Sequence, residues 1–227
     1  MNRVVKSLLD EELLLGRLIL VRHGRTNLNR PGKHERLRAW LDVPLSEEGL
    51  EEAEETARLV SKYQVEKIFS SSLRRALQTA NAISQQSKAN VIPTKSLRPW
   101  NLGAFAGQKV HELLPFLEML NTRPDIPAPG GESFFQFYER YASQLAALLV
   151  MAEQSSLNIV AVTHVRNILA TPAILEGRDR REVPVSGGPP TGSIVVLEKE
   201  DHRWNMRIET GINVHIPVHE TQLDLAS

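Results

Sequence analysis

The sequence predicts an α/β fold, in which a mostly parallel central sheet is flanked by helices within a single domain. Short apolar runs with β propensity alternate along the chain with segments whose apolar residues recur at helical spacing. The length of 227 residues suits one large domain with a sizeable core. We therefore expect one domain over residues 18–227, preceded by an N-terminal extension, residues 1–17.

The first strand is predicted over residues 18–21, because Leu-Ile-Leu-Val is a short apolar run typical of a strand that is covered on both faces. A helix is predicted over residues 47–61, since its small and aliphatic side chains recur on one side. Ser46 is expected to open this helix, and acidic residues occupy its first turn.

A second strand is predicted over residues 67–70, where an apolar run precedes several serines. The following helix, residues 72–86, is expected to begin with serines in capping positions. A short strand at residues 91–92 is expected to stop at Pro93, because proline cannot donate to a sheet.

The segment of residues 97–131 contains five prolines and little sustained periodicity, so we expect an excursion that passes over the sheet and closes the site. After it, the pattern predicts a long helix, a central strand, a further helix and a terminal strand pair. These elements cover residues 134–153, 158–163, 166–175, 193–198 and 204–210.

Composition excludes several classes of function. The chain has 27 basic and 27 acidic residues, so its net charge gives no bulk affinity for nucleic acid. It has no cysteine, which excludes disulfides and thiolate chemistry and fits a reducing compartment. No apolar run reaches the roughly 18 residues of a membrane span. Residues 1–17 contain acidic residues within a leucine-rich stretch, which indicates a short amphipathic helix rather than a secretory signal. We expect a cytoplasmic protein.

Arginine and histidine residues follow three of the predicted strands. Arg22 and His23 follow the first, Arg75 begins the helix after the second, and His164 follows the strand at residues 158–163. Ligands of open α/β sheets bind outside the carboxyl ends of the strands, so we expect these side chains to share one crevice. An arginine can bind two phosphate oxygens at once, and an imidazole nitrogen can take up a phosphoryl group. The pattern therefore predicts a phosphate pocket.

The loop after the first strand adds further candidates for that pocket. Gly24 is expected to let the backbone turn and approach a ligand, so that Thr26, Asn29 and Arg25 converge on the same anion. Taken alone, an Arg-His pair after a strand is more often a surface ion-pair partner than a catalytic pair. The other two strand ends favour the catalytic interpretation.

Five blocks, in this order, resemble the histidine phosphatase superfamily, and the resemblance covers residues 18–198. It implies a phosphoglycerate-mutase-like three-layer sandwich, in which His23 carries the phosphoryl group and Arg22, Arg75 and His164 complete its pocket. The blocks are Arg22-His23-Gly24 with Thr26 and Asn29, then residues 41–49, 71–80 and 130–133, and Thr163-His164.

The chain departs from this family at the position of the proton donor. Many members have a glutamate two residues after a leucine, where this chain has Pro99. Replacement acids within the excursion are Glu112, Asp125 and Glu132, although Glu132 could equally be a helix-capping partner. Val165 stands where most relatives have glycine, which is expected to reshape the pocket wall.

The resemblance implies a metal-independent phosphatase without a cofactor, acting on a phosphomonoester or a similar substrate through a phosphohistidine. Fixed cations would take the role that magnesium has elsewhere. A phosphoglycerate-type mutase remains an alternative, as does a regulatory module that binds phosphorylated ligands or acts weakly on phosphohistidine or phosphoprotein. The expected substrate is a small phosphorylated molecule or a phosphoprotein, and a homodimer remains open. Arg74 and Arg166 are either secondary anion contacts or solvated surface residues.

Overall fold

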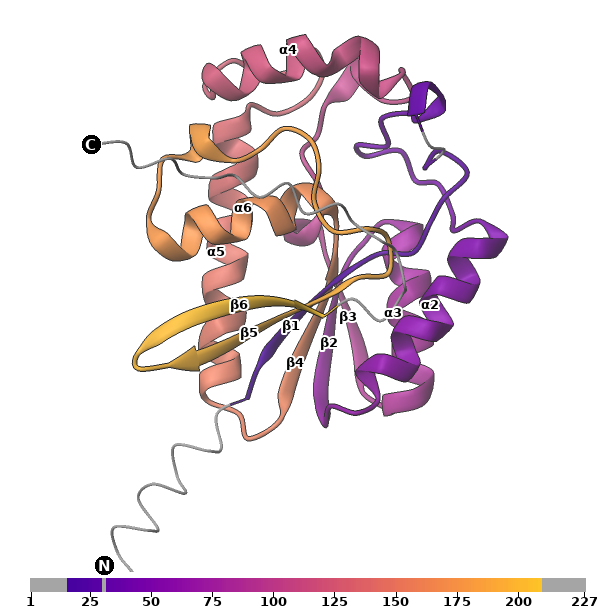
Figure 1. Ribbon diagram of the computed structural model, residues 1–227, viewed down its shortest axis with the longest axis vertical. Coiled ribbons are helices and arrows are strands. Elements are labelled where there is room, and N and C mark those ends of the chain that lie inside the picture. The colour runs from indigo at the N-terminus through magenta and orange to yellow at the C-terminus, as the bar shows by residue number, and fades with distance from the viewer. Residues whose placement is uncertain (1–15, 30–31, 210–227) are drawn as a thin grey trace, which may run out of the picture.

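The computed structural model describes residues 16–29 and 32–209. Its sheet has six strands in the order β3-β2-β4-β1-β5-β6 (Figure 1). Strands β1 to β4 run parallel, while β5 pairs antiparallel with β1 and with β6. The predicted α/β class with a mostly parallel sheet is therefore confirmed. The strand bounds are β1 Leu18–Arg22, β2 Val65–Ser71, β3 Asn90–Thr94, β4 Asn158–Thr163, β5 Ile194–Glu200 and β6 Arg203–Glu209.

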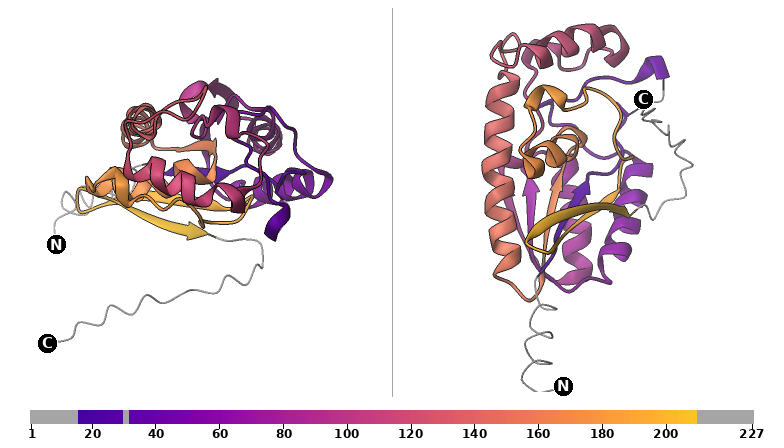
Figure 2. Two further views of the ribbon diagram at one scale, coloured as in Figure 1. Left: turned by 90° about the horizontal axis from the view of Figure 1, so that it is seen from above. Right: turned by 60° about the vertical axis from the view of Figure 1, so that its left-hand side comes forward.

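Helices cover both faces of the sheet, so the molecule has three layers (Figures 1 and 2). Helices α2 and α3 lie on one face, α5 and α6 lie on the other, and α4 lies above the carboxyl ends of the parallel strands. The helix bounds are α2 Glu47–Val60, α3 Arg74–Ser87, α4 Val110–Thr122, α5 Phe134–Glu153 and α6 Val165–Glu176.

Strand β1 lies between two apolar cores. Leu18 and Leu20 belong to the core that includes Phe137 of α5, whereas Ile19 and Val21 belong to the core that α2 and α3 complete. Alternate side chains of a strand point to opposite faces, and all five positions of β1 are buried. Burial of each large apolar side chain contributes about 1.5–3 kcal/mol, so β1 is held firmly with its carboxyl end at the edge below α4.

The start of α3 differs from its prediction. The helix begins at Arg74 and no serine caps it, because the residue before it is Leu73, which makes no capping hydrogen bond through its side chain. Instead, Asp42 Oδ1 accepts a hydrogen bond from the Arg74 amide at 2.7 Å. The cap comes from a distant loop, which ties that loop to the helix that carries Arg75.

Two prolines are accommodated in ways that the sequence did not predict. Strand β3 does not stop at Pro93 but includes it and ends at Thr94. Because β3 is an edge strand, a residue without an amide hydrogen is tolerated there. The region 97–131 contains a helix of 13 residues, α4, with Pro115 inside it. Pro115 is exposed, and α4 is held by Leu113 and Leu117, one turn apart on its buried side.

The predicted helix within residues 1–17 falls almost wholly outside the described part of the chain, which begins at Gly16. Among the helices of residues 16–29 and 32–209, none has the length and apolar character needed to cross a bilayer.

Candidate active site

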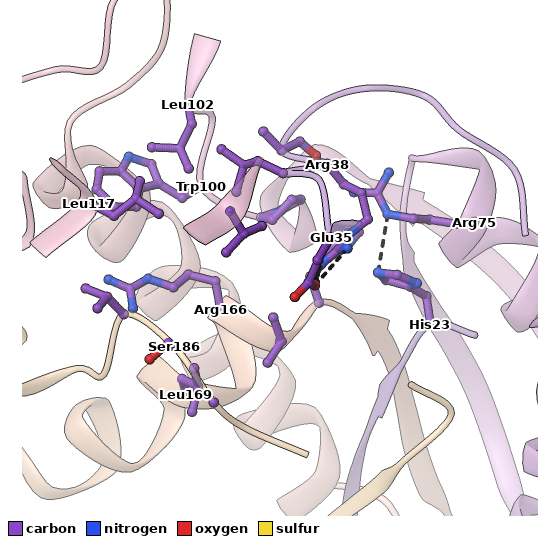
Figure 3. Close-up of a pocket in the computed structure, with 18 residues that line it drawn as sticks. His23, Glu35, Arg38, Arg75, Trp100, Leu102, Leu117, Arg166, Leu169 and Ser186 are labelled. Carbon is purple, nitrogen blue, oxygen red and sulfur yellow. Dashed lines mark hydrogen bonds and ion pairs between the residues drawn. The ribbon is translucent and has the colours of Figure 1, made fainter. Parts of the chain in front are cut away.

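The carboxyl ends of β1, β2 and β4 open into one cavity of about 170 Å³ (Figure 3). His23, Arg75 and His164 lie on its wall, as the sequence predicts. Within residues 16–29 and 32–209, no three side chains of histidine, aspartate or glutamate are placed to hold a metal ion together. The other lining residues are Glu35, Leu37, Arg38, Ala39, Pro99, Trp100, Leu102, Val110, Leu117, Val165, Arg166, Leu169, Val185, Ser186 and Gly187.

The hydrogen bonds of His23 define its tautomer. Its Nδ1 is 2.7 Å from the carbonyl oxygen of Gly24, and because a carbonyl only accepts, Nδ1 must carry the hydrogen. The lone pair therefore lies on Nε2, to which Arg75 Nε donates at 3.3 Å. Burial lowers the pKa of His23 well below 6.5, and the charges of Arg75 and Arg22 lower it further. His23 is thus a neutral imidazole with an available nitrogen.

Arg75 is fixed by the backbone of a distant loop. Its Nη1 donates to the Leu41 carbonyl at 2.7 Å and its Nη2 to the Ala39 carbonyl at 2.9 Å. Burial and the charge of Arg38 lower its pKa to about 9, against the opposing effect of Asp42. The guanidinium therefore stays charged at neutral pH while only 1% of the residue is exposed. It is a rigid cation beside His23.

His164 lies beside His23, with the ring centroids 4.9 Å apart. Its Nε2 is 2.8 Å from the hydroxyl of Ser71, and its buried Nδ1 has no partner. Burial, followed by the charge of Arg75, lowers the pKa of His164 well below 6.5. If the Ser71 hydroxyl donates to Nε2, a neutral His164 carries its hydrogen on Nδ1, where it can be donated to a phosphoryl oxygen.

Ser71 belongs to the site, although the sequence did not predict it. The serines that follow the second strand are expected as helix caps, yet Ser71 is the last residue of β2, fully buried, and its hydroxyl contacts His164. The available signal was its position, because Ser71 ends a parallel strand on the same sheet edge as the histidines.

Arg22 lies just outside the lining of the cavity. Its Nη1 donates to the carbonyl of Pro189 at 2.5 Å, and its buried Nε has no partner. Burial and the charge of Arg38 lower its pKa to about 10. Arg22 is nevertheless close enough to lower the pKa of His23, so it contributes positive charge to the site.

Gly24 serves a different purpose from the predicted turn. Its φ is not in the left-handed region that favours glycine. A Cβ at Gly24 would lie 2.4 Å from the carbonyl oxygen of Gly49, so a side chain does not fit between the loop and α2. The Gly24 amide donates to Thr79 Oγ1 of α3 at 3.1 Å. The glycine therefore allows the His23 loop to pack closely against two helices.

The other loop residues are engaged within the loop or on its surface. The Thr26 amide and hydroxyl donate to Asn29 Oδ1 at 3.0 and 2.8 Å, which closes a turn behind His23. Arg25 forms an ion pair with Glu52 of α2 at 3.3 Å. None of Thr26, Asn29 and Arg25 lines the cavity, so the predicted convergence on the phosphate is not seen for them.

None of the three candidate acids of the excursion lines the cavity. Glu112 is exposed and pairs with Lys109 at 2.9 Å, and Asp125 is also exposed. The carboxylate that does line the cavity is Glu35, which the sequence analysis did not consider. Arg38 binds one Glu35 oxygen through Nη1 and Nη2, at 3.1 and 3.0 Å.

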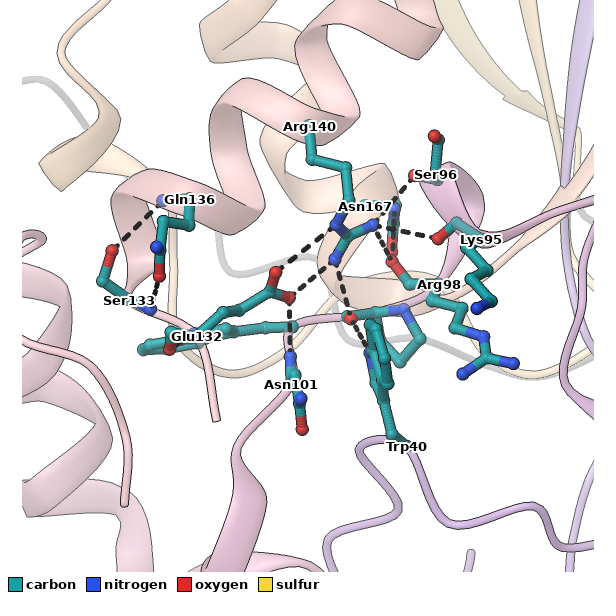
Figure 4. Close-up of polar contacts among 12 residues, drawn as sticks. Trp40, Lys95, Ser96, Arg98, Asn101, Glu132, Ser133, Gln136, Arg140 and Asn167 are labelled. Atoms are coloured by element: carbon teal, nitrogen blue, oxygen red, sulfur yellow. Dashed lines mark hydrogen bonds and ion pairs between the residues drawn. The ribbon is translucent and has the colours of Figure 1, made fainter. Parts of the chain in front are cut away.

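Glu132 has a structural role (Figure 4). It accepts hydrogen bonds from Arg140 at 2.6 Å and from the Asn101 amide at 2.8 Å. Arg140 also donates to carbonyl oxygens of the segment 95–99. This network fixes the segment that contains Pro99, so Glu132 holds the cavity wall in place rather than facing the cavity.

Comparison with known proteins agrees with this geometry. A family model described as the histidine phosphatase superfamily (branch 1) matches residues 18–209. Glucosyl-3-phosphoglycerate phosphatase of Mycolicibacterium vanbaalenii is 33% identical over 190 residues, which cover 80% of this chain and 83% of that protein. Phosphoglycerate mutase-like protein 4 of Arabidopsis thaliana is 31% identical over 163 residues, covering 68% of this chain and 69% of that protein.

A solved structure shows the same architecture. Mycobacterial glucosyl-3-phosphoglycerate phosphatase in complex with VO3 superposes with a TM-score of 0.71 at 28% identity, covering 86% of this chain and 98% of that chain. The resemblance found in the sequence motifs is thereby confirmed.

Proposed function

The chain belongs to the histidine phosphatase superfamily, and on this premise we propose that it hydrolyses a phosphomonoester through a phosphohistidine at His23, without a metal ion. One observation carries the proposal. His23 Nε2 holds the lone pair of the neutral ring on the cavity wall, because Nδ1 is committed to the Gly24 carbonyl. Arg75 and His164 beside it supply hydrogen-bond donors for the phosphoryl oxygens.

The reaction proceeds in two displacements. The phosphoryl oxygens take over the Arg75 donor that His23 Nε2 receives in the free protein, and Nε2 attacks phosphorus in line. The P–N bond forms as the P–O bond to the leaving group breaks. A water molecule then attacks phosphorus, the P–N bond breaks, and inorganic phosphate leaves with neutral His23 restored. Charge on the transferred group is stabilised by Arg75, Arg22 and His164 Nδ1.

Glu35 is the proton donor of this scheme. This assignment is supported by the position of Glu35 on the cavity wall. None of the acids predicted from the sequence lies there. The arriving phosphate competes with Glu35 for Arg38, and in this scheme Glu35 acts in its protonated form. Glu35 then gives its proton to the leaving oxygen, and in the second step it accepts a proton from the attacking water.

A mutase is the second candidate, because phosphoglycerate mutase-like proteins are among the relatives. A mutase would use the same phosphohistidine but return the phosphoryl group to another hydroxyl. The two activities are separated by incubating the phosphorylated substrate with an excess of acceptor alcohol and comparing phosphate release with transfer. We expect release to dominate, and predominant transfer would favour the mutase.

The test is a screen of phosphorylated metabolites, phosphopeptides and aryl phosphates for phosphate release, carried out with a chelator present. Wild-type protein and His111→Ala, a change at an exposed residue of α4, should release phosphate from the same substrates. His23→Ala should release none. Binding of phosphorylated ligands without any release would favour the regulatory module instead.

A further inference from the structure

Besides Arg75 and Arg38, the cavity has a further cation, Arg166, at the opposite end from His23. Arg166 lies in the first turn of α6, two residues after His164, and only 9% of it is exposed. Figure 3 shows its side chain extending away from His23 toward Trp100 and Leu117. The wall between the two ends is mainly apolar, so the cavity has a cationic group at each end of an apolar stretch.

The partners of Arg166 are all neutral. Its Nη1 donates to the Pro184 carbonyl, and its Nη2 donates to Asn121 Oδ1 at 2.5 Å. Its guanidinium carbon lies 4.6 Å from the ring centroid of Phe134 and 5.6 Å from that of Trp100. Its Nε is buried and has no hydrogen-bond partner. Among residues 16–29 and 32–209, no carboxylate pairs with Arg166.

A purely structural arginine is expected to have a counter-charge when it is buried, because a desolvated cation is costly. Two other largely buried arginines follow this expectation, since Arg38 pairs with Glu35 and Arg140 pairs with Glu132. Arg75 and Arg22, which serve the phosphoryl group, have no carboxylate partner among the described residues. Arg166 shares the pattern of the ligand-binding arginines.

We propose that Arg166 binds a second anionic group of the substrate, a carboxylate, through its unpartnered Nε. The substrate class is then a phosphomonoester that bears a carboxylate beyond a mainly apolar spacer. A single charge and one free N–H suit a monoanionic carboxylate better than a second phosphate dianion, which needs several donors. This inference rests on the proposed phosphatase activity at His23.

The test compares phosphate esters of ω-hydroxy acids, in a series of increasing chain length, with their primary amides. The acid and the amide have nearly the same shape and differ in charge. For the chain length that spans the cavity, wild-type kcat/KM should favour the acid by about tenfold or more. In Arg166→Met, which keeps much of the apolar contact, this ratio should fall to about one, and Arg166→Lys should retain part of it.

Arg180→Met is the matched control, because Arg180 also lies over aromatic rings, those of Phe135 and Tyr138, but outside the cavity. It should keep the wild-type ratio. A merely structural role for Arg166 predicts that acid and amide esters lose activity alike. If Arg166→Met fails to fold, the wild-type ratio of kcat/KM between acid and amide still tests the proposal. Equal values for the two would overturn it.

Two further outcomes are distinguishable. A bisphosphate of the same spacer hydrolysed better than the acid, with a preference lost in Arg166→Met, would replace the carboxylate by a second phosphate. Absence of phosphate release from every ester, aryl phosphates included, would instead contradict the proposed function at His23.

Discussion

At the scale of single residues, the site depends on a histidine that stays neutral. Burial, then the charges of Arg75 and Arg22, lower the pKa of His23 well below 6.5. The ring should therefore keep its lone pair as pH falls through 6.5, and protonate only in more acidic solution. Of these two charges, that of Arg75 has the larger effect on His23. Arg75→Met removes it, so the midpoint should rise while burial still holds the pKa below its ordinary value. Histidine ring signals followed by NMR titration test this, with Arg25→Met as a control outside the cavity. A wild-type midpoint at or above 6.5 would show that burial and these charges do not lower the pKa of His23.

A second prediction at the residue scale concerns the hydrogen bond between Ser71 and His164. Its hydroxyl, 2.8 Å from His164 Nε2, is the contact that fixes the orientation of that ring. Loss of such a hydrogen bond costs about 0.5–1.5 kcal/mol. Ser71→Ala should therefore lower kcat/KM by roughly twofold to tenfold. Ser70→Ala is the control, because the Ser70 hydroxyl donates to the Ser71 carbonyl instead of a histidine. Equal activities of wild type and Ser71→Ala would show that His164 needs no such partner.

At the scale of elements, the start of α3 affects both the stability of the protein and the site. Asp42 caps the helix through the Arg74 amide, and its charge also acts on Arg75. Loss of a side-chain cap costs about 1 kcal/mol, so Asp42→Ala should lower the free energy of unfolding in urea by that amount. Asp42→Asn keeps an oxygen acceptor without the charge, and its stability should stay close to that of the wild type. An equal loss in both variants would mean that charge, and not capping, holds the start of α3.

The helices and strands also show which parts of the fold could be predicted from the sequence. The bounds of α5 and β4 agree with their predictions, because α5 has a long uninterrupted helical pattern and β4 has a continuous apolar run. Helix α4 was missed because Pro115 breaks its pattern, although tertiary contacts through its buried leucines support it. The cap by Asp42 joins residues 32 positions apart, a contact that no local motif reveals.

At the scale of the whole molecule, the parallel topology brings three distant strand ends to one cavity, and this could be predicted. The proposed acid, Glu35, could not be predicted, because its position depends on how the loops fold over the sheet. Glu35 reaches the cavity wall, whereas Glu112 remains on the outer side of α4. Zero net charge over the chain conceals a local excess of arginine at that edge.

The proton donor is tested by plotting rate against the pKa of the leaving group for a series of phosphate esters. A positioned general acid contributes about 100- to 10,000-fold, and mostly for poor leaving groups. In the wild type the rate should depend only weakly on the pKa of the leaving group. In Glu35→Gln this dependence should become steep. Glu112→Gln, at an exposed position outside the cavity, should leave it unchanged. A steep wild-type plot that neither substitution alters would indicate a site that works without an acid.

The most direct measurement follows the phosphoryl group itself. Protein mixed with phosphorylated substrate is quenched within one turnover in alkali, where phosphohistidine survives, and its peptides are analysed by mass spectrometry. We expect a phosphoryl group on His23, lost on brief acid treatment and absent from His23→Ala. A phosphoryl group on another residue, or undiminished phosphate release by His23→Ala, would contradict the role assigned to His23.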